Sequence, residues 1–292
     1  MPKMEKEITI LIPTHNRGRI LVKTLEAINA QTYDLNKVEV LVIDDFSEDN
    51  PKRSLTEFLQ RNKVRFQLRY FRMPRNSGQG MVRNRGVGLA EGRMLFFLGD
   101  DTIPKENFIH EHMKVHHENE GEEIAVLGRV FWADEVRNDF MNYIENIQFH
   151  YQTIKDKNNV KFHFYTSNIS LAKKWFRNEK YSEAFKNYGL EDLEIGYRLE
   201  NNGLRVVYNP EAIVYHHHSY DFRQFCDRMV NVGRSAKVFV ELHPELKRKF
   251  IPLGINILKW FAFLLSRKKI FSRRLYWYSN FIYCYIKGLQ NL

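Results

Sequence analysis

The sequence predicts an α/β fold in which a mostly parallel sheet carries helices on both faces. Short apolar runs alternate with amphipathic stretches over the first hundred residues, a pattern typical of strands joined by helices. The runs at 8–12 and 94–98 are almost continuously apolar, as in strands that are covered on both faces. Acidic residues directly follow two of the runs, at the edge where parallel sheets bind ligands.

The elements follow from this alternation and from helical spacing of apolar residues. In the first third we expect strands at 8–12, 38–43, 66–71 and 94–98, and helices at 18–30, 54–60 and 78–91. In the less regular middle we expect strands at 125–130, 167–171, 206–208 and 212–215, the last two around a turn at Asn209–Pro210, and helices at 139–151 and 193–200. From Asp221 onward the chain reads as helical and rich in aromatic residues.

Composition narrows the classes of protein. The two cysteines, Cys226 and Cys284, match no metal-ligand spacing, so reduced thiols are favoured over a disulfide. The charged opening and the lack of an apolar run of about 20 residues predict a cytoplasmic protein with neither a secretory signal nor a membrane span. The formal net charge of +10 favours nucleic acid, anionic lipid or phosphorylated substrates, although a solvated surface also explains it. The basic excess lies mainly at Lys247, Arg248, Lys249, Lys259, Arg267, Lys268, Lys269, Arg273 and Arg274.

Two pairs of carboxylates follow predicted strands. Asp100 and Asp101 come after the strand at 94–98, and Asp44 and Asp45 after the strand at 38–43. Adjacent carboxylates beside a buried strand are costly unless a cation reaches them, and a divalent ion with bound phosphates is a natural partner. An Asp-rich turn explains both pairs equally well, and Thr102–Pro104 also fits the start of a helix.

Three further groups of residues are candidates for chemistry. The glycines of the loop at 76–80 let backbone approach a phosphate at the start of the following helix, although Arg83 stands where the dinucleotide fingerprint needs glycine. Glu191 and Asp192 begin a helix, either as simple caps or with a general base among them. In an extended chain His216 and His218 share a face, where either is a candidate ligand for Mn²⁺, while the lack of nearby cysteine weakens a zinc interpretation.

Taken together, five segments in order resemble glycosyltransferase family 2, whose members have the Rossmann-like GT-A fold. The segments are 10–17, 42–47, 78–87, 97–101 and 187–199, and the resemblance covers about 7–240. One departure stands out. Many members carry Asp where this chain has Gly99, so the first carboxylate of the family's D-x-D motif is missing.

The resemblance implies an inverting transferase that moves a sugar from a nucleoside diphosphate sugar, with UDP favoured, to a hydroxyl of a saccharide or lipid-linked saccharide. It implies a divalent cofactor, Mn²⁺ or Mg²⁺, bound by Asp101 with His216 or His218. It makes Asp192 the base and lets Glu191 orient the acceptor, while Trp132 either stacks on the acceptor sugar or is a core aromatic residue. The nucleotide-binding residues it implies are Pro13, Thr14, Asn16, Arg17, Asp44, Asp45, Gly78, Arg83 and Asp100.

On this basis we divide the chain into a catalytic domain, 1–220, and a C-terminal helical region, 221–292. The nucleotide half of the catalytic domain is about 1–104 and the acceptor half about 105–220. Residues 251–292 combine apolar faces with flanking Lys and Arg, so they either contact the inner face of the cell membrane peripherally or pack on protein.

Other classes of function compete with the transferase. They are a non-catalytic sugar-nucleotide-binding protein of the same fold, supported by Gly99, and a nucleotidyltransferase, which also pairs metals with carboxylates. A glycoside hydrolase needs no nucleotide site. Nucleic acid binding rests on net charge alone, so we expect no nucleic acid partner.

Overall fold

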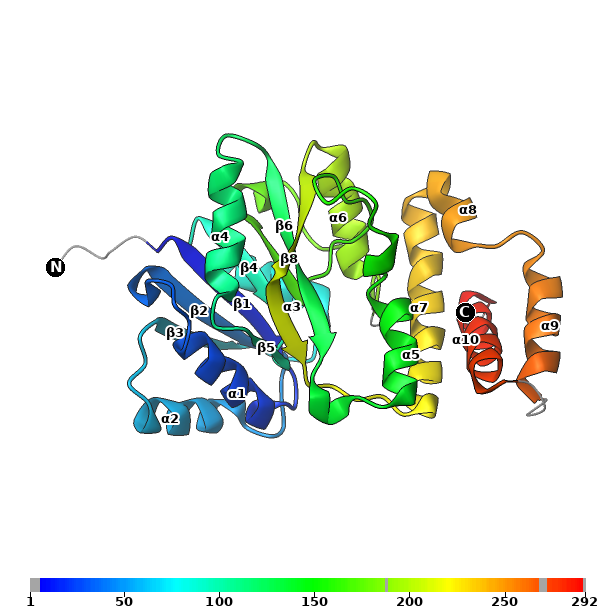
Figure 1. Cartoon of the computed structure of the whole chain (residues 1–292), viewed down its shortest axis with the longest axis horizontal. Helices are drawn as coiled ribbons and strands as arrows, with labels where there is room; N and C mark the ends of the chain where they lie inside the picture. The colour runs from blue at the N-terminus through cyan, green and yellow to red at the C-terminus, as the bar shows by residue number, and fades with distance from the viewer. Residues whose placement is uncertain (1–5, 187–188, 268–271, 291–292) are drawn as a thin grey trace.

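The computed structural model describes residues 6–186, 189–267 and 272–290, and these residues build an eight-stranded sheet (Figure 1). Its strands are β1 Ile8–Thr14, β2 Val38–Asp44, β3 Gln67–Arg72, β4 Met94–Leu98, β5 Thr102–Pro104, β6 Ile124–Trp132, β7 Asn168–Ala172 and β8 Arg205–His216. Their order across the sheet is β3-β2-β1-β4-β7-β6-β8-β5, and only β7 and β5 run antiparallel to their neighbours. The mostly parallel sheet confirms the predicted fold class. The first two residues of the predicted segment 187–199, and Lys268 and Lys269, lie outside the described residues.

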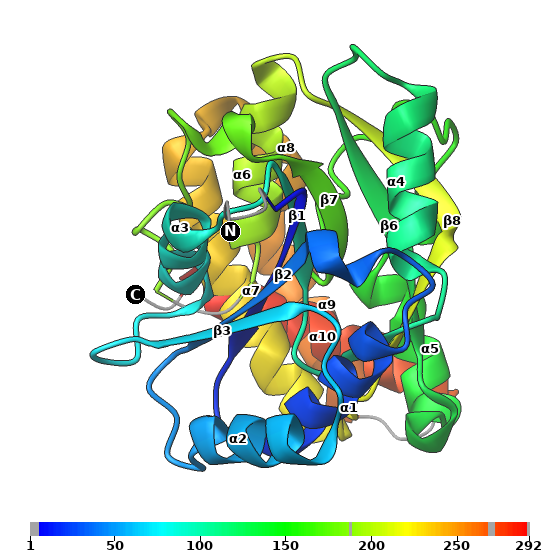
Figure 2. The same cartoon turned by 90° about the vertical axis from the view of Figure 1, so that its left-hand side faces the viewer.

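Helices cover both faces of the sheet, with α3 on one side of the strands and α4 on the other (Figure 2). The helices are α1 Gly18–Asn29, α2 Pro51–Arg61, α3 Gln79–Leu89, α4 Phe108–Glu118, α5 Asp139–Gln148, α6 Glu191–Asn201, α7 Phe222–Leu242, α8 Lys247–Phe250, α9 Ile255–Arg267 and α10 Arg273–Gln290. Local chemistry sets two of the helix starts. The side chain of Asn50 accepts the N–H of Arg53 ahead of α2, and Asp221 forms a capping box with Gln224 at α7.

The structure differs from the sequence prediction around β8. Asn209 and Pro210 lie inside one continuous strand instead of forming a turn. The register of β8 against β6 jumps between Gly128 and Arg129, so residues 210–212 form a bulge where Pro210 need not donate a hydrogen bond. Thr102–Pro104 pairs with the end of β8 as the strand β5, and so does not start a helix.

The C-terminal helices pack one on another, α10 on α7 and α9 on α10 (Figure 1). Glycines allow backbone contact where α7 and α10 cross. A Cβ added at Gly233 would lie 2.1 Å from the carbonyl oxygen of Tyr285, and one added at Gly288 would lie 2.0 Å from that of Val230. Cys226 and Cys284 meet across this same interface as free thiols that hydrogen-bond each other.

One stretch of the described residues, Pro244–Ser266, is long and apolar enough by length and composition to cross a membrane, which corrects our expectation that no such stretch occurs. The structure does not form it as one helix. α8 ends at Phe250, residues 251–254 form bends and turns, and α9 begins at Ile255. The 13 residues of α9 extend about 20 Å, less than the roughly 30 Å of a bilayer's hydrocarbon core.

Candidate active site

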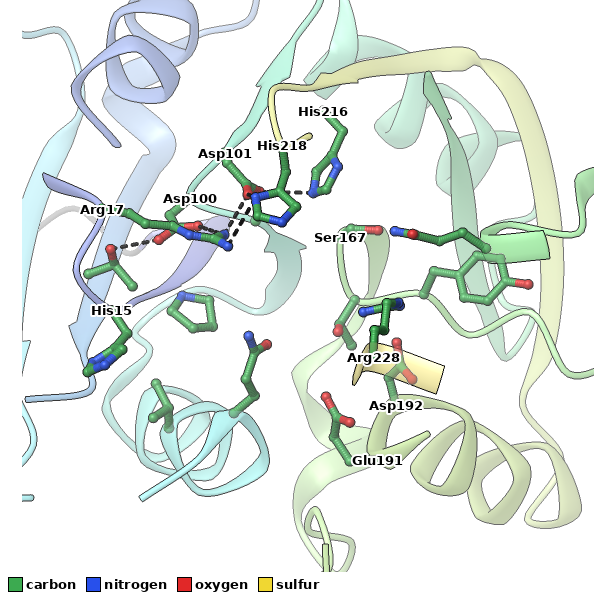
Figure 3. Close-up of a pocket in the computed structure, with 18 of the residues that line it drawn as sticks. His15, Arg17, Asp100, Asp101, Ser167, Glu191, Asp192, His216, His218 and Arg228 are labelled. Atoms are coloured by element: carbon green, nitrogen blue, oxygen red, sulfur yellow. Dashed lines mark hydrogen bonds and ion pairs between the residues drawn. The ribbon is translucent and has the colours of Figure 1, made fainter. Parts of the chain in front are cut away.

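The carboxyl ends of β1, β2 and β4 open into a cleft of about 570 Å³, a volume that suits a small ligand. Parallel pairing of β6 with β8 brings His216 to the same edge. Figure 3 shows Asp100, Asp101, His216 and His218 on one side of the cleft, with Glu191 and Asp192 on the other. The predicted residues that line the cleft are Pro13, Thr14, Arg17, Asp45, Arg83, Asp100, Asp101, Glu191, Asp192, His216 and His218.

Asp100 and Asp101 form a buried acidic pair. The hydroxyl of Thr14 donates to Asp100 Oδ2 at 2.8 Å, and Nη1 of Arg17 donates to Asp100 Oδ1 at 3.2 Å and Asp101 Oδ2 at 2.5 Å (Figure 3). Burial, reinforced by the charge of Asp101, raises the pKa of Asp100 to about 6. Burial acts in the same direction on Asp101, but His216 and Arg17 outweigh it and hold the pKa of Asp101 below its ordinary range. The pair is therefore anionic near pH 7 and attracts positive charge.

Asp101 and the two histidines present the atoms that a divalent metal would use. His216 Nε2 lies 3.1 Å from Asp101 Oδ1, and His218 Nδ1 lies 4.0 Å from Asp101 Oδ2. Within the described ranges, no group of three or more His, Cys, Asp or Glu side chains is arranged so that it could hold a metal ion by itself, and Asp101 with the two histidines is no exception. Carboxylate oxygens suit Mg²⁺ and Mn²⁺, and such ions bind through one or two protein carboxylates together with substrate phosphates. Asp101 with one of the histidines would therefore hold such an ion only together with further oxygen ligands from a bound substrate.

Asp45 organises the loop that leads into α3. Its carboxylate accepts the backbone N–H of Ser77 at 2.7 Å and of Gly78 at 3.0 Å. Gly78 has a φ of 82°, in the left-handed region that glycine adopts readily. Asp45 lines the cleft, whereas Gly78 does not line it and contacts Asp45 through its backbone N–H. The predicted nucleotide role of Gly78 is thus at most indirect in this structure.

Three other predicted residues do not line the cleft. Asp44 is fully buried, and its carboxylate accepts the Tyr70 hydroxyl at 2.6 Å and the N–H of Ser47 at 2.8 Å. Asn16 shapes the neighbouring loop. Trp132 is fully buried with its ring centroid 5.1 Å from that of His216, so no surface remains on which a sugar could stack. Burial therefore corrects two predictions, the acceptor role of Trp132 and the direct nucleotide role of Asp44. Asn16 does not line the cleft, and its side chain accepts the N–H of Glu48 in the loop.

The opposite wall is the first turn of α6. Arg83 donates to Glu191 Oε1 at 3.3 Å and to Gln79 Oε1 at 2.7 Å, which ties α3 to α6. Glu191 is held by this ion pair, while Asp192 lines the cleft beside it. Burial, reinforced by the charge of Glu191, raises the pKa of Asp192 to about 7. A carboxylate with a pKa near the working pH is suited to act as a general base.

Sequence reasoning missed the contribution of α7 to the cleft. Its lining residues are Gln224, Asp227, Arg228 and Asn231. Their spacing of three to four residues puts them on one helix face, and that polar spacing was the signal available in the sequence. The sequence prediction read this helix by its aromatic residues and placed it in an appendage. Other lining residues that it missed are His15, Gln79, Val82, Gln148, Phe149, Tyr165, Thr166, Ser167 and Tyr220.

Comparison with known families identifies the family of the chain. The profile described as "Glycosyl transferase family 2" matches residues 9–179, more than half of the chain. The chain belongs to glycosyltransferase family 2. The match spans the strand ends that carry Thr14, Asp45, Asp100 and Asp101.

Curated relatives of this family 2 member are larger proteins. The chain is 24% identical over 278 residues to chondroitin synthase from Escherichia coli, a match that covers 83% of this chain and 39% of that protein. It is 25% identical over 266 residues to validoxylamine A glucosyltransferase from Streptomyces hygroscopicus, covering 82% of this chain and 62% of the relative. The chain thus spans less than two thirds of the length of these relatives.

Solved structures share the GT-A-like fold. The mannosyltransferase PcManGT from Pyrobaculum calidifontis, in complex with GDP-Man and Mn²⁺, has a TM-score of 0.68 at 14% identity, covering 99% of this chain and 88% of that one. TarS 1–349 from S. aureus has a TM-score of 0.59 at 15% identity, covering 97% and 90%. At this identity the likeness establishes the fold, and the C-terminal helices fall within the aligned length.

Proposed function

We propose that this family 2 protein transfers a sugar from a nucleoside diphosphate sugar to an acceptor hydroxyl with inversion at the anomeric carbon. The observation that carries the proposal is the pairing of two walls in one cleft. An anionic site at Asp100 and Asp101 faces a carboxylate, Asp192, whose pKa is raised to about 7. The first suits a departing diphosphate and its metal, and the second suits proton removal from an acceptor.

On the donor wall, Asp101 with His216 or His218 would hold Mn²⁺ or Mg²⁺. Such an ion neutralises the charge that grows on the leaving diphosphate. Arg17 already contacts both carboxylates, and its guanidinium suits a phosphate once a ligand enters. Thr14 and Asp45, at the ends of β1 and β2, line the region where the nucleoside would lie.

On the acceptor wall, Asp192 removes the proton from the acceptor hydroxyl. The acceptor oxygen then forms a bond to the anomeric carbon as the bond from that carbon to the diphosphate oxygen breaks. Attack from the Asp192 side and departure toward the Asp101 side invert the configuration. General base catalysis contributes about 10²–10⁴-fold to such a step.

The acceptor would lie against α7. Gln224, Asp227, Arg228 and Asn231 offer both hydrogen-bond donors and acceptors to the cleft. Side chains of this kind suit a polyhydroxylated partner, so we propose a saccharide or lipid-linked saccharide. We favour a UDP-sugar as donor, and TarS in complex with UDP-GlcNAc is one of the similar structures.

Gly99 bears on whether the protein turns over its donor. A Cβ at Gly99 would lie 3.2 Å from two side-chain atoms of Thr102, which leaves little space for the aspartate that many family members carry here. Asp100 and Asp101 still face the cleft, so Gly99 is weak support for a protein that only binds the donor. A nucleotidyltransferase would release pyrophosphate from a nucleoside triphosphate, and a pyrophosphate assay would reveal it.

Two measurements test the proposal. A thermal-shift screen of nucleotide sugars with and without Mn²⁺ should raise the melting temperature for the true donor, because a ligand that binds only the native state stabilises it. With that donor, Asp192→Asn should reduce transfer by about 10²–10⁴-fold while donor binding persists. The matched control is Asp134→Asn, at an exposed carboxylate. Full transfer by Asp192→Asn would reject the base assignment.

A further inference from the structure

The positive charge of the chain is concentrated at its C-terminal end. After Glu245 the sequence holds ten Lys and Arg residues and no Asp or Glu, and these ten account for the whole formal net charge of +10. The preceding residues carry equal numbers of acidic and basic side chains. Lys247, Arg248, Arg273 and Arg274 are exposed at the two ends of the segment that contains α9. This end of the molecule therefore attracts anionic surfaces.

The same segment exposes a continuous apolar face. Its side chains recur every three to four residues, which puts them on one side of α9 and of the turn before it. Such a stripe is unusual on a protein surface unless something covers it. The exposed fractions are Leu253 88%, Ile257 66%, Trp260 57%, Phe261 53% and Leu264 37%.

The opposite face of α9 is fastened to α10, which keeps the apolar face outward. Ala262 is buried, and the rings of Phe263 and Tyr283 lie 5.7 Å apart. Asn256 Oδ1 accepts the side-chain amide of Gln290 at 2.8 Å. α10 lies between α7 and α9, so α9 forms the outer edge of the molecule (Figure 1). The helix therefore shows its apolar side to the surroundings with no loss of its own packing.

We propose that α9 docks flat onto an anionic lipid surface. Its apolar side chains would enter the boundary between headgroups and acyl chains, with Trp260 at the level where tryptophan concentrates. The flanking Lys and Arg side chains would contact anionic headgroups. At 13 residues α9 is too short to span the bilayer, so it lies in the plane of the surface.

Charge favours a lipid surface over a second copy of the chain. Two copies that met through this face would bring together two segments with ten cations each and no carboxylate. Like charges in an interface are unfavourable, whereas a surface of anionic headgroups compensates them. The apolar stripe and the charge thus point to the same partner.

Co-sedimentation of the full chain with vesicles tests the proposal. Binding should be strong to phosphatidylcholine mixed with phosphatidylglycerol, weak to phosphatidylcholine alone, and reduced by added salt. The double substitution Ile257→Ser with Trp260→Ser should weaken binding by at least about tenfold. Arg273→Gln with Arg274→Gln should weaken it by about 30-fold. Both pairs are exposed or project from the surface, so the fold should persist.

Matched controls distinguish docking through α9 from non-specific adsorption to vesicles. Leu59→Ser removes an apolar side chain that is 48% exposed on α2, and Lys23→Gln with Lys52→Gln removes two exposed charges far from α9 in the fold. Neither control should change vesicle binding. Failure of the wild type to bind anionic vesicles would overturn the proposal, as would full binding by the Ile257/Trp260 variant. A dimer in sedimentation without lipid, dissolved by the same variant, would assign the face to a second copy instead. Donor turnover in solution stays measurable in every variant, so these outcomes are independent of the catalytic proposal.

Discussion

The two walls of the cleft are fastened in different ways. On the donor wall, Thr14 is hydrogen-bonded to Asp100, and Asp45 to Ser77 and Gly78, across 32 to 86 residues of sequence. On α7, the side chains of Gln224 and Asn231 bond to Asp221 and Arg234 a single turn away. The donor wall is thus held by contacts between distant segments, as is Glu191 through Arg83, whereas these α7 side chains are held within one helix. We therefore expect substitutions on α7 to alter recognition of the proposed acceptor without disturbing the donor site.

The largest expected loss of activity follows from a substitution on the donor wall. Asp101→Asn should lower kcat/KM by about 10⁴-fold, because it removes the anionic ligand from the metal and diphosphate site. A chelator should abolish wild-type activity in the same way, and Mn²⁺ should restore it in the wild type alone. Circular dichroism should show an unchanged fold. Retention of a tenth of the activity would contradict the assignment.

The pH profile sharpens the role of the acceptor wall. Asp192 must be ionised to act as a base, and its pKa of about 7 means that activity should fall about tenfold per pH unit below that value. Glu191→Gln should shift the limb to lower pH, because the charge of Glu191 raises the pKa of Asp192. An ordinary aspartate is ionised from pH 5 to pH 8, so a wild-type activity profile that is flat over this range would refute the role of Asp192 as a base with a raised pKa.

The same raised pKa has a consequence for stability. The folded protein binds the proton of Asp192 more tightly than the unfolded chain does. The stability that this proton binding contributes is present below the ordinary aspartate pKa and is lost as the pH rises through about 7. Asp192→Asn should therefore gain stability relative to the wild type as the pH rises from the ordinary aspartate pKa to about 7, with no further gain above 7, measured by urea denaturation at several pH values. A stability difference that does not vary with pH would argue against the shift.

A smaller effect is expected on stability, because Arg17 compensates the charge of the two carboxylates on the donor wall. Arg17→Ala should lower the free energy of unfolding by about 1–3 kcal/mol, because two buried carboxylates lose a partner that is itself partly exposed. Mn²⁺ should raise the melting temperature of this variant more than that of the wild type, since the metal then takes over the role of the guanidinium. Equal shifts in both proteins would mean that Arg17 and the metal do not share the site.

The smallest expected effect concerns α7. Arg228→Gln should raise the KM for the acceptor by about tenfold, the equivalent of one lost charge-assisted hydrogen bond, with donor hydrolysis unchanged. Arg223→Gln, an exposed arginine on the same helix that does not line the cleft, is the control. An equal loss in both variants would mean that α7 acts only through its charge.

The same contrast explains what the sequence could predict. Strand ends of a parallel sheet meet at one edge, so Thr14, Asp45 and Asp101 could be brought together from alternation and motif order alone. The position of α7 depends on tertiary packing that local periodicity does not encode. Trp132 ends a strand where burial depends on Phe149 and His216, which pack on its ring from other elements. The sequence analysis divided β8 into two strands, because Asn-Pro is locally a turn signal, whereas the structure accommodates Pro210 in a bulge of one strand.

The crossing of α7 and α10 at Gly233 and Gly288 makes a stiff linkage between the outer edge and the cleft. Gly233 and Arg228 are on the same helix, about 7.5 Å apart along its axis. A bulkier residue at the crossing would push the backbones apart and tilt the face that carries Arg228. Substitutions on the exposed face of α9 leave this crossing unchanged. A side chain added at Gly233 or Gly288 would instead displace α7 and the cleft residues that it carries.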